Sequence, residues 1–221
     1  MRNIGAGLKL LYEDCDIIVV DKPFGLLSIS REGGRDKSVY NLLTEYLRGK
    51  GGAPAVVHRL DRDTSGVMVF ARSGRVKKKL MENWEASVTV RRYVCIAEGD
   101  FSEYSAENAG LIDLSLGEDR SGRIVVKKGG MPARTWWKLI RTGNRYSLLE
   151  LELESGRRNQ IRAHLAALGY PVAGDKKYWA RTDPVRRLCL HASELGFYHP
   201  GDGRYMEFRS PVPGRFRKII L

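Results

Sequence analysis

One short segment holds most of the chemistry that this sequence could perform. Residues 58–66 read His-Arg-Leu-Asp-Arg-Asp-Thr-Ser-Gly and lie between two apolar runs, 55–57 and 67–70. A loop between two buried strands holds its side chains in fixed positions. Charged groups beside a core are costly unless they pair, so the segment is either a structural ion-pair network or an active site. The residues alone leave both interpretations open.

Short apolar runs bounded by polar residues or glycine predict the strands that must position this segment. The clearest is 146–154, where Leu149, Leu151 and Leu153 alternate with glutamates, so one face is expected to pack against the core and the other to face solvent. The remaining expected strands are 17–20, 55–57, 67–70, 93–96 and 124–126.

Three helices are expected. Ser38 can cap a helix over 39–48, and Ser73 can cap a second one whose Val76, Leu80 and Trp84 recur every four residues. A third should run from about 159 to 168, with Gly169 ending it. Polar or glycine-rich stretches at 31–36, 49–54 and 102–109 predict loops.

Composition excludes several classes of protein. The 221 residues are 43% hydrophobic and 29% charged, as in ordinary globular proteins, so disordered, collagen-like and disulfide-rich chains are excluded. No apolar run approaches the ~20 residues that cross a bilayer, and the start lacks a secretory segment. A cytoplasmic protein is therefore expected.

The positive charge is unevenly distributed. Residues 1–110 carry 17 Lys or Arg against 15 Asp or Glu, whereas residues 111–221 carry 21 against 11, and the net charge is +12. Such an excess favours binding to a polyanion, with a solvated surface as the alternative. We expect one α+β domain over 1–221, made of two halves that meet at about 102–122.

Three cysteines, Cys15, Cys95 and Cys189, lie far apart in the sequence. We interpret them as reduced core residues, because no spacing typical of a zinc site or a disulfide pair accompanies them. No metal is expected.

Beyond these patterns, segment 58–66 resembles the HRLD-x-DTSG motif of the RluA-type pseudouridine synthases. Residues 21–27, Asp-Lys-Pro-Phe-Gly-Leu-Leu, resemble the family's N-K-P-x-G-L motif, and 92–94 its K-x-Y motif. Residues 156–175 resemble its G-R-x-x-Q-I-R-x-H-L and G-x-P-x-x-G-D block. The resemblance covers about 14–213, nearly the whole chain.

The resemblance implies a fold and a reaction. The fold is α+β, with a mixed, mostly antiparallel central sheet of two halves, flanking helices and a central active-site cleft. The reaction isomerises uridine in RNA to pseudouridine without a cofactor. Because the match begins so near the first residue, the small N-terminal S4 domain of many relatives is expected to be missing.

Three catalytic residues follow from the resemblance. Asp61 matches the essential carboxylate of the family, with Asp63 supporting it. Arg162 matches an arginine that would pair with this carboxylate, lower its pKa and fix its rotamer. Tyr93 matches the active-site tyrosine, whose ring can stack on uracil. Whether Asp61 adds to the sugar or base, or promotes a glycal intermediate, stays open.

RNA contacts are also implied. The target base must leave its stack, and Arg59 matches the residue that fills the gap, with an ion pair to Asp63 as the alternative. The residues expected to contact RNA are Arg59, Arg62, Thr64, Arg157, Arg158 and Gln160. His58 and His164 are expected to serve as structural hydrogen-bonders. Asn159 and Trp179 depart from the family pattern.

Two other functions compete with the enzyme. A protein that kept the fold but lost catalysis could serve as an RNA-binding or ribosome-assembly factor, although the combined presence of Asp61, Tyr93 and Arg162 argues against it. Metal-dependent hydrolysis by Asp61 and Asp63 lacks a third oxygen ligand nearby. The expected partner is a stem-loop of rRNA or tRNA, bound by a monomer without a membrane or a metal.

Overall fold

The chain forms two compact units in this computed structural model, which describes residues 2–30, 36–82, 84–105 and 107–220. The first unit comprises Met1–Val90 and Ala192–Ser210, and the second comprises Arg91–His191 and Pro211–Leu221. The chain thus passes from one unit to the other within a strand near residue 90 and returns near residue 191. The boundary expected at 102–122 instead lies inside the second unit, where Ala109–Asp113 pairs with 134–138 and Leu116–Glu118 pairs with Ile124–Val126.

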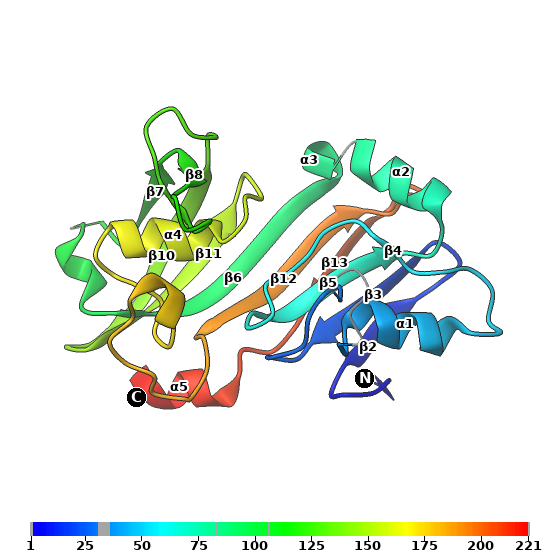
Figure 1. Cartoon of the computed structure of the whole chain (residues 1–221), viewed down its shortest axis with the longest axis horizontal. Helices are drawn as coiled ribbons and strands as arrows, with labels where there is room; N and C mark the ends of the chain where they lie inside the picture. The colour runs from blue at the N-terminus through cyan, green and yellow to red at the C-terminus, as the bar shows by residue number, and fades with distance from the viewer. Residues whose placement is uncertain (1, 31–35, 83, 106, 221) are drawn as a thin grey trace. The chain divides into compact units, whose positions relative to one another are not determined.

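The first unit is a sheet with helices (Figure 1). Neighbouring strands of the sheet run β1-β2-β3-β5-β12-β13, and β4 also pairs with β5. Its elements are β1 (Arg2–Asn3), β2 (Lys9–Glu13), β3 (Ile17–Lys22), α1 (Val39–Leu47), β4 (Ala55–Val56), β5 (Ser65–Ala71), α2 (Gly74–Glu82), α3 (Trp84–Ser87), β12 (Leu190–Tyr198) and β13 (Tyr205–Arg209).

The second unit has a sheet in the order β6-β11-β10-β7 and a separate hairpin of β8 and β9. Its elements are β6 (Val88–Glu98), the 3-10 turn η1 (Phe101–Glu103), β7 (Ala109–Asp113), β8 (Leu116–Glu118), β9 (Ile124–Val126), β10 (Arg134–Thr142), β11 (Tyr146–Leu153), α4 (Gln160–Ala167), the 3-10 turn η2 (Lys176–Tyr178) and α5 (Gly214–Ile220). The β6–β11, β11–β10 and β10–β7 pairings are antiparallel, and the α+β class is confirmed.

An unbroken apolar run and an alternating pattern in the sequence correspond to a strand buried on both faces and a strand buried on one face. Every residue of β5 is buried, as its unbroken apolar run predicts, whereas β11 buries Ser147, Leu149 and Leu151 and leaves the residues between them partly exposed. Each predicted strand is confirmed, and the largest difference is at 93–96, which lies inside the longer β6.

The predicted helices are confirmed, with one difference. Ser38 caps α1 by accepting a hydrogen bond from the Asn41 N–H at 3.2 Å. The second predicted helix divides into α2 and a separate short helix, α3, that begins at Trp84. Gly169 follows α4 with φ +88°, a conformation that glycine adopts without strain. Of the expected loop at 31–36, residues 31–35 lie outside the described residues.

Two of the three cysteines are core residues. Cys95 and Cys189 are buried free thiols, and burial raises the pKa of both, that of Cys189 to about 12. The expectation was wrong for Cys15, which is exposed. Cys15 lies in the turn between β2 and β3, where Asp14 accepts hydrogen bonds from the Asp16 and Ile17 N–H groups.

Among the described residues, no helix is long and apolar enough to cross a membrane.

Candidate active site

A buried lysine holds the loop that carries Asp61. This loop, residues 57–64, joins β4 to β5. The Lys22 side chain is 0% exposed, and its ammonium donates to three main-chain carbonyls: Pro23 at 3.1 Å, Leu26 at 2.7 Å and Arg62 at 2.9 Å. A cation that binds carbonyl oxygens fixes the main chain of two segments at once. Lys22 therefore ties the turn after β3 to the loop.

A serine fixes the residue directly before Asp61. The buried Ser28 hydroxyl donates to the Leu60 carbonyl at 2.6 Å and accepts from the Leu60 N–H at 3.1 Å. The residue before Asp61 thus has both main-chain polar groups satisfied by one side chain. The Thr64 N–H donates to the Asp61 carbonyl at 3.1 Å and closes the turn.

The start of β5, directly after the loop, requires glycine. Gly66 has φ +121°, and a Cβ at this position would lie 2.0 Å from the carbonyl oxygen of Ala192 on β12. Only glycine allows the main chain to approach this closely. The G of the HRLD-x-DTSG string is therefore a packing requirement of the sheet.

His58 plays the structural role expected of it. Its Nε2 accepts from the Val69 N–H at 3.0 Å, and its ring contacts the ring of Trp84 at a centroid distance of 5.2 Å. Because Nε2 accepts, the neutral ring carries its proton on Nδ1. The histidine bonds the start of the loop to the middle of β5.

The loop presents its charged side chains to different degrees. Asp61 is partly buried, whereas Arg59, Arg62 and Asp63 are exposed, and Thr64 is buried. Arg62 also donates from Nε to the Gly25 carbonyl at 3.2 Å. Of the loop residues expected to contact RNA, Arg59 and Arg62 thus offer exposed cations, and Thr64 belongs to the packed end of the loop.

Arg162 on α4 is held by a carboxylate. Its Nε and Nη2 donate to the two oxygens of Asp175 at 2.6 and 2.8 Å. The two side chains are 11% and 1% exposed, so the pair is largely desolvated. A bidentate pair fixes the plane as well as the position of a guanidinium. Asp175 is the D of the G-x-P-x-x-G-D string, and its pairing with Arg162 is visible only in the tertiary structure.

Tyr178 supports the same pair. Its ring centroid lies 5.0 Å from the Arg162 Cζ, and its hydroxyl donates to the Ile124 carbonyl at 2.8 Å. The Asp175 carboxylate also accepts from the Tyr178 N–H at 3.3 Å, which caps η2. Two residues that follow α4, Asp175 and Tyr178, therefore both contact the Arg162 guanidinium.

The start of α4 is organised by Gln160, which is 2% exposed. Its amide oxygen accepts from the Ser155 hydroxyl at 2.8 Å and from the Arg157 N–H at 3.1 Å. Its amide nitrogen donates to the Arg134 carbonyl and the Thr135 hydroxyl, both at 2.9 Å. These contacts give Gln160 a positioning role in the free protein, and its contact with RNA stays a prediction.

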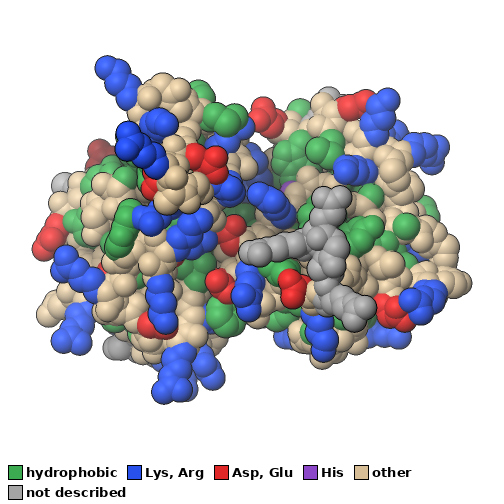
Figure 2. Space-filling view, viewed as in Figure 1, with side chains coloured by type: hydrophobic (Ala, Val, Ile, Leu, Met, Phe, Trp, Pro, Cys, Tyr) green, Lys and Arg blue, Asp and Glu red, His purple; other side chains and the backbone are tan. Residues whose placement is uncertain are grey.

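The two arginines before α4 contact neighbouring loops. Arg157 donates from Nε to the Pro132 carbonyl at 3.3 Å. Arg158 pairs with Glu118 and donates to the Gly122 carbonyl at 2.9 Å, so it binds the β8–β9 hairpin. Figure 2 shows Lys and Arg side chains spread over the visible face of the second unit.

His164 is a buried structural residue, as expected. Its Nδ1 lies 3.0 Å from the Thr135 hydroxyl and its Nε2 lies 3.0 Å from the Leu114 carbonyl. Burial lowers the pKa of His164, and the hydrogen bond to Leu114 and the charge of Asp113 only partly oppose this. The ring is therefore neutral, donates from Nε2 and accepts at Nδ1.

Tyr93 lies on β6 opposite Leu151 of β11, partly buried against the core of the second unit. Asp61 belongs to the first unit, whereas Tyr93 and Arg162 belong to the second. The ion pair between Asp61 and Arg162 stays a prediction.

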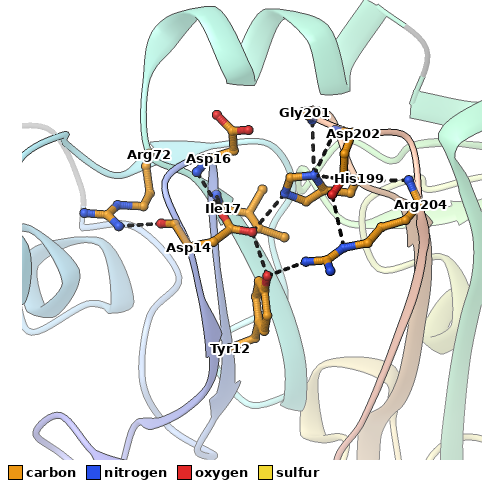
Figure 3. Close-up of polar contacts among 9 residues, drawn as sticks. All are labelled: Tyr12, Asp14, Asp16, Ile17, Arg72, His199, Gly201, Asp202 and Arg204. Carbon is orange, nitrogen blue, oxygen red and sulfur yellow. Dashed lines mark hydrogen bonds and ion pairs between the residues drawn. The ribbon is translucent and has the colours of Figure 1, made fainter.

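A second polar cluster, in the first unit, joins two turns (Figure 3). His199 places Nε2 3.0 Å from the Asp14 carboxylate and Nδ1 2.9 Å from that of Asp202. Burial alone would raise the pKa of Asp14, but hydrogen bonds from the Ile17 N–H and the Tyr12 hydroxyl outweigh it and lower the pKa. The His199 side chain is buried, so these contacts fasten the β2–β3 turn to the β12–β13 turn.

The described residues contain no group of three or more His, Cys, Asp or Glu side chains placed to hold a metal ion.

Comparison with known proteins gives the family. A family model described as RNA pseudouridylate synthase matches residues 16–167. An uncharacterized RNA pseudouridine synthase of Bacillus subtilis, YlyB, is 34% identical over 96% of this chain and 72% of its own length. Ribosomal large subunit pseudouridine synthase D of Nitrosomonas europaea is 32% identical over 96% of this chain and 64% of its own length.

A solved structure, human RNA Pseudouridylate Synthase Domain Containing 4, has the same fold. Its TM-score is 0.73 at 24% identity, over 95% of this chain and 90% of that one. The motifs, the fold and the family model agree. The chain belongs to the RNA pseudouridylate synthase family, and its activity is the isomerisation of uridine in RNA.

Proposed function

We propose that this protein forms pseudouridine in ribosomal RNA of the large subunit, with Asp61 as the catalytic carboxylate. The observation that carries the assignment of Asp61 is the construction of its loop. Lys22 and Ser28 fix the main chain on both sides of Asp61 with hydrogen bonds that are buried or partly buried. Such rigid support is typical of a side chain that must meet a reacting atom. The rRNA substrate is suggested by relatives named ribosomal large subunit pseudouridine synthase D.

The reaction breaks the bond between N1 of uracil and C1′ of ribose and forms a bond between C5 and C1′. The hydrogen at C5 leaves as a proton and N1 takes up a proton, so the product is an isomer of the substrate. Asp61 acts as an ionised carboxylate, either by adding to the sugar or base or by promoting a glycal intermediate.

Arg162 and Tyr93 complete the proposed catalytic set. The Arg162 guanidinium, its plane fixed by Asp175, stabilises the charged form of Asp61 and its rotamer. Tyr93 stacks on the uracil, and its hydroxyl relays a proton.

The target uridine must be extruded from a stem-loop before this chemistry, at a cost of a few kcal/mol. Arg59, an exposed cation two residues from Asp61, fills the vacated space. Exposed Arg62, together with Arg157 and Arg158, contacts phosphates of the RNA. All of these roles can be filled by one copy of the chain, so the protein acts as a monomer, in the cytoplasm.

The decisive experiment measures tritium release from RNA that carries 5-tritiated uridine. Unmodified large-subunit rRNA and tRNA serve as separate substrates. We expect release from rRNA by the wild type, and a loss of about a thousandfold or more in Asp61→Asn, because a neutral amide cannot act as the charged carboxylate. Asp63→Asn is the matched control, two residues away in the same loop and exposed, and should lose far less.

Other outcomes assign the function elsewhere. Release from tRNA alone would move the substrate class to tRNA. Tight binding of both RNAs by the wild type without release would favour an RNA-binding or ribosome-assembly role. Equal activity of Asp61→Asn and the wild type would remove Asp61 from the reaction.

A further inference from the structure

Trp179 occupies a main-chain conformation that does not suit it. Its φ is +61°, in the left-handed region that residues with a Cβ rarely adopt, and its side chain is 63% exposed. A large exposed ring on a strained main chain stabilises the fold little. Strain of this kind often marks a functional position.

An arginine covers part of this ring. The Arg123 Cζ lies 4.2 Å from the Trp179 ring centroid, which is a cation–π contact. Arg123 precedes β9 in the β8–β9 hairpin, and that hairpin is bound by Arg158 at Gly122 and by the Tyr178 hydroxyl at Ile124. Hydrogen bonds to the residues on both sides of Arg123 therefore hold its main chain in place.

The ring is connected by direct contacts to the proposed catalytic arginine. The ring centroids of Trp179 and Tyr178 are 6.4 Å apart, and that of Tyr178 lies 5.0 Å from the Arg162 Cζ. An extended nucleic-acid strand spans such a distance with one or two nucleotides, since its step is about 3.4 Å when stacked and longer when unstacked. A base next to the target uridine could therefore reach Trp179.

Basic side chains flank the ring on η2, and the hollow that Trp179 also lines contains Glu98, Asp100 and Glu103. Lys176 and Lys177 lie on η2 directly before Tyr178 and Trp179, and both are exposed. Aromatic rings among cations are the arrangement with which proteins bind single-stranded nucleic acid: bases stack on the rings, and the cations attract the phosphates.

We propose that Trp179 and Arg123 form a stacking platform for an unpaired base of the RNA substrate that lies beside the target uridine. This inference rests on the proposed function and assigns a substrate-positioning role to a residue that departs from the family's motif. The platform binds RNA and takes no part in the chemical step.

Trp179→Gly tests the proposal without endangering the fold. Glycine adopts φ +61° freely, so relief of strain offsets the lost ring contacts and the melting temperature should stay near that of the wild type. Trp136→Ala is the control, because it removes another exposed ring of the second unit, one whose indole N–H is bound by Glu154.

Two measurements are needed: binding of a fluorescent single-stranded oligouridylate by anisotropy, and the kcat and KM of tritium release from rRNA. For Trp179→Gly we expect affinity to fall and KM to rise by between about fivefold and a hundredfold, as for the loss of one base stack. The kcat should stay within about twofold. Arg123→Gln should change KM in the same direction by less, and Trp136→Ala should match the wild type.

The outcomes separate this proposal from the proposed function. If the wild type releases tritium and Trp179→Gly has the same KM and affinity, the platform is refuted while the enzyme stands. If the wild type releases none but Trp179→Gly binds oligouridylate less tightly than Trp136→Ala, the platform stands and the enzyme assignment fails. A fall in kcat alone would also overturn the platform.

Discussion

The two units hold their proposed catalytic residues by opposite means. In the first unit, Lys22 and Ser28 bind main-chain groups and so position the loop around Asp61. In the second, Asp175 binds the guanidinium of Arg162 itself. A loop has no regular hydrogen bonds to fix its path, so its main chain needs partners, whereas a helix fixes its own main chain and only the long side chain is left to be positioned.

Replacement of Lys22 should have the largest effect. Lys22→Met removes a buried cation from three carbonyls, and we expect a loss of about 2–4 kcal/mol in the free energy of unfolding, with little tritium release. Urea denaturation measures the stability. Lys9→Met, at an exposed position on β2, is the control and should change stability by less than about 0.5 kcal/mol.

Asp175→Asn should have a smaller effect on stability and a specific one on catalysis. It removes the carboxylate charge that pairs with the largely buried Arg162 guanidinium, which should cost about 1–3 kcal/mol and lower kcat by about tenfold to a hundredfold, with KM changed less.

Asp113→Asn is the control for Asp175→Asn, since it breaks an exposed pair with Arg134 in the same unit and should leave kcat intact. A wild-type kcat in Asp175→Asn would show that the guanidinium needs no carboxylate to hold it. The contrast between the two units would then fail.

The smallest effect concerns acid. Burial lowers the pKa of His164 in the folded protein, whereas the unfolded chain takes up a proton near pH 6.5. Above about pH 7.5 both states are neutral and stability is unaffected. As the pH falls through 6.5 the unfolded state gains the proton first, so the free energy of unfolding decreases.

His164→Gln should remove this dependence. Between pH 7.5 and 5.5 we expect the wild type to lose about 1 kcal/mol more than the variant, as measured by urea denaturation at each pH. Identical pH profiles for the two proteins would mean that His164 does not titrate differently in the folded state. The test shows whether protonation of His164, on the buried face of α4, destabilises the unit that contains Arg162.

Local patterns predicted about half of the elements, and strands such as β10 and β12 were not among them. Alternation gave β11, the apolar run gave β5, and Ser38 and Gly169 marked helix ends, because each of these signals acts within a few residues. The unit boundary was not predictable in this way. The first unit takes back Ala192–Ser210, and this pairing of distant strands depends on the whole fold.

The same division holds for the site. The motif strings identified Asp61, Tyr93 and Arg162 as candidates, because residue type and spacing are properties of the chain. The placement of His58 beside a strand and of His164 in a helix indicated structural roles. The partners of these residues were decided by tertiary structure. Lys22 meets the Arg62 carbonyl 40 positions away, and Asp175 meets Arg162 across the turn after α4. A buried charge is stable only beside a hydrogen-bonding or oppositely charged partner. The tertiary fold decides which residue becomes that partner, and spacing along the chain does not.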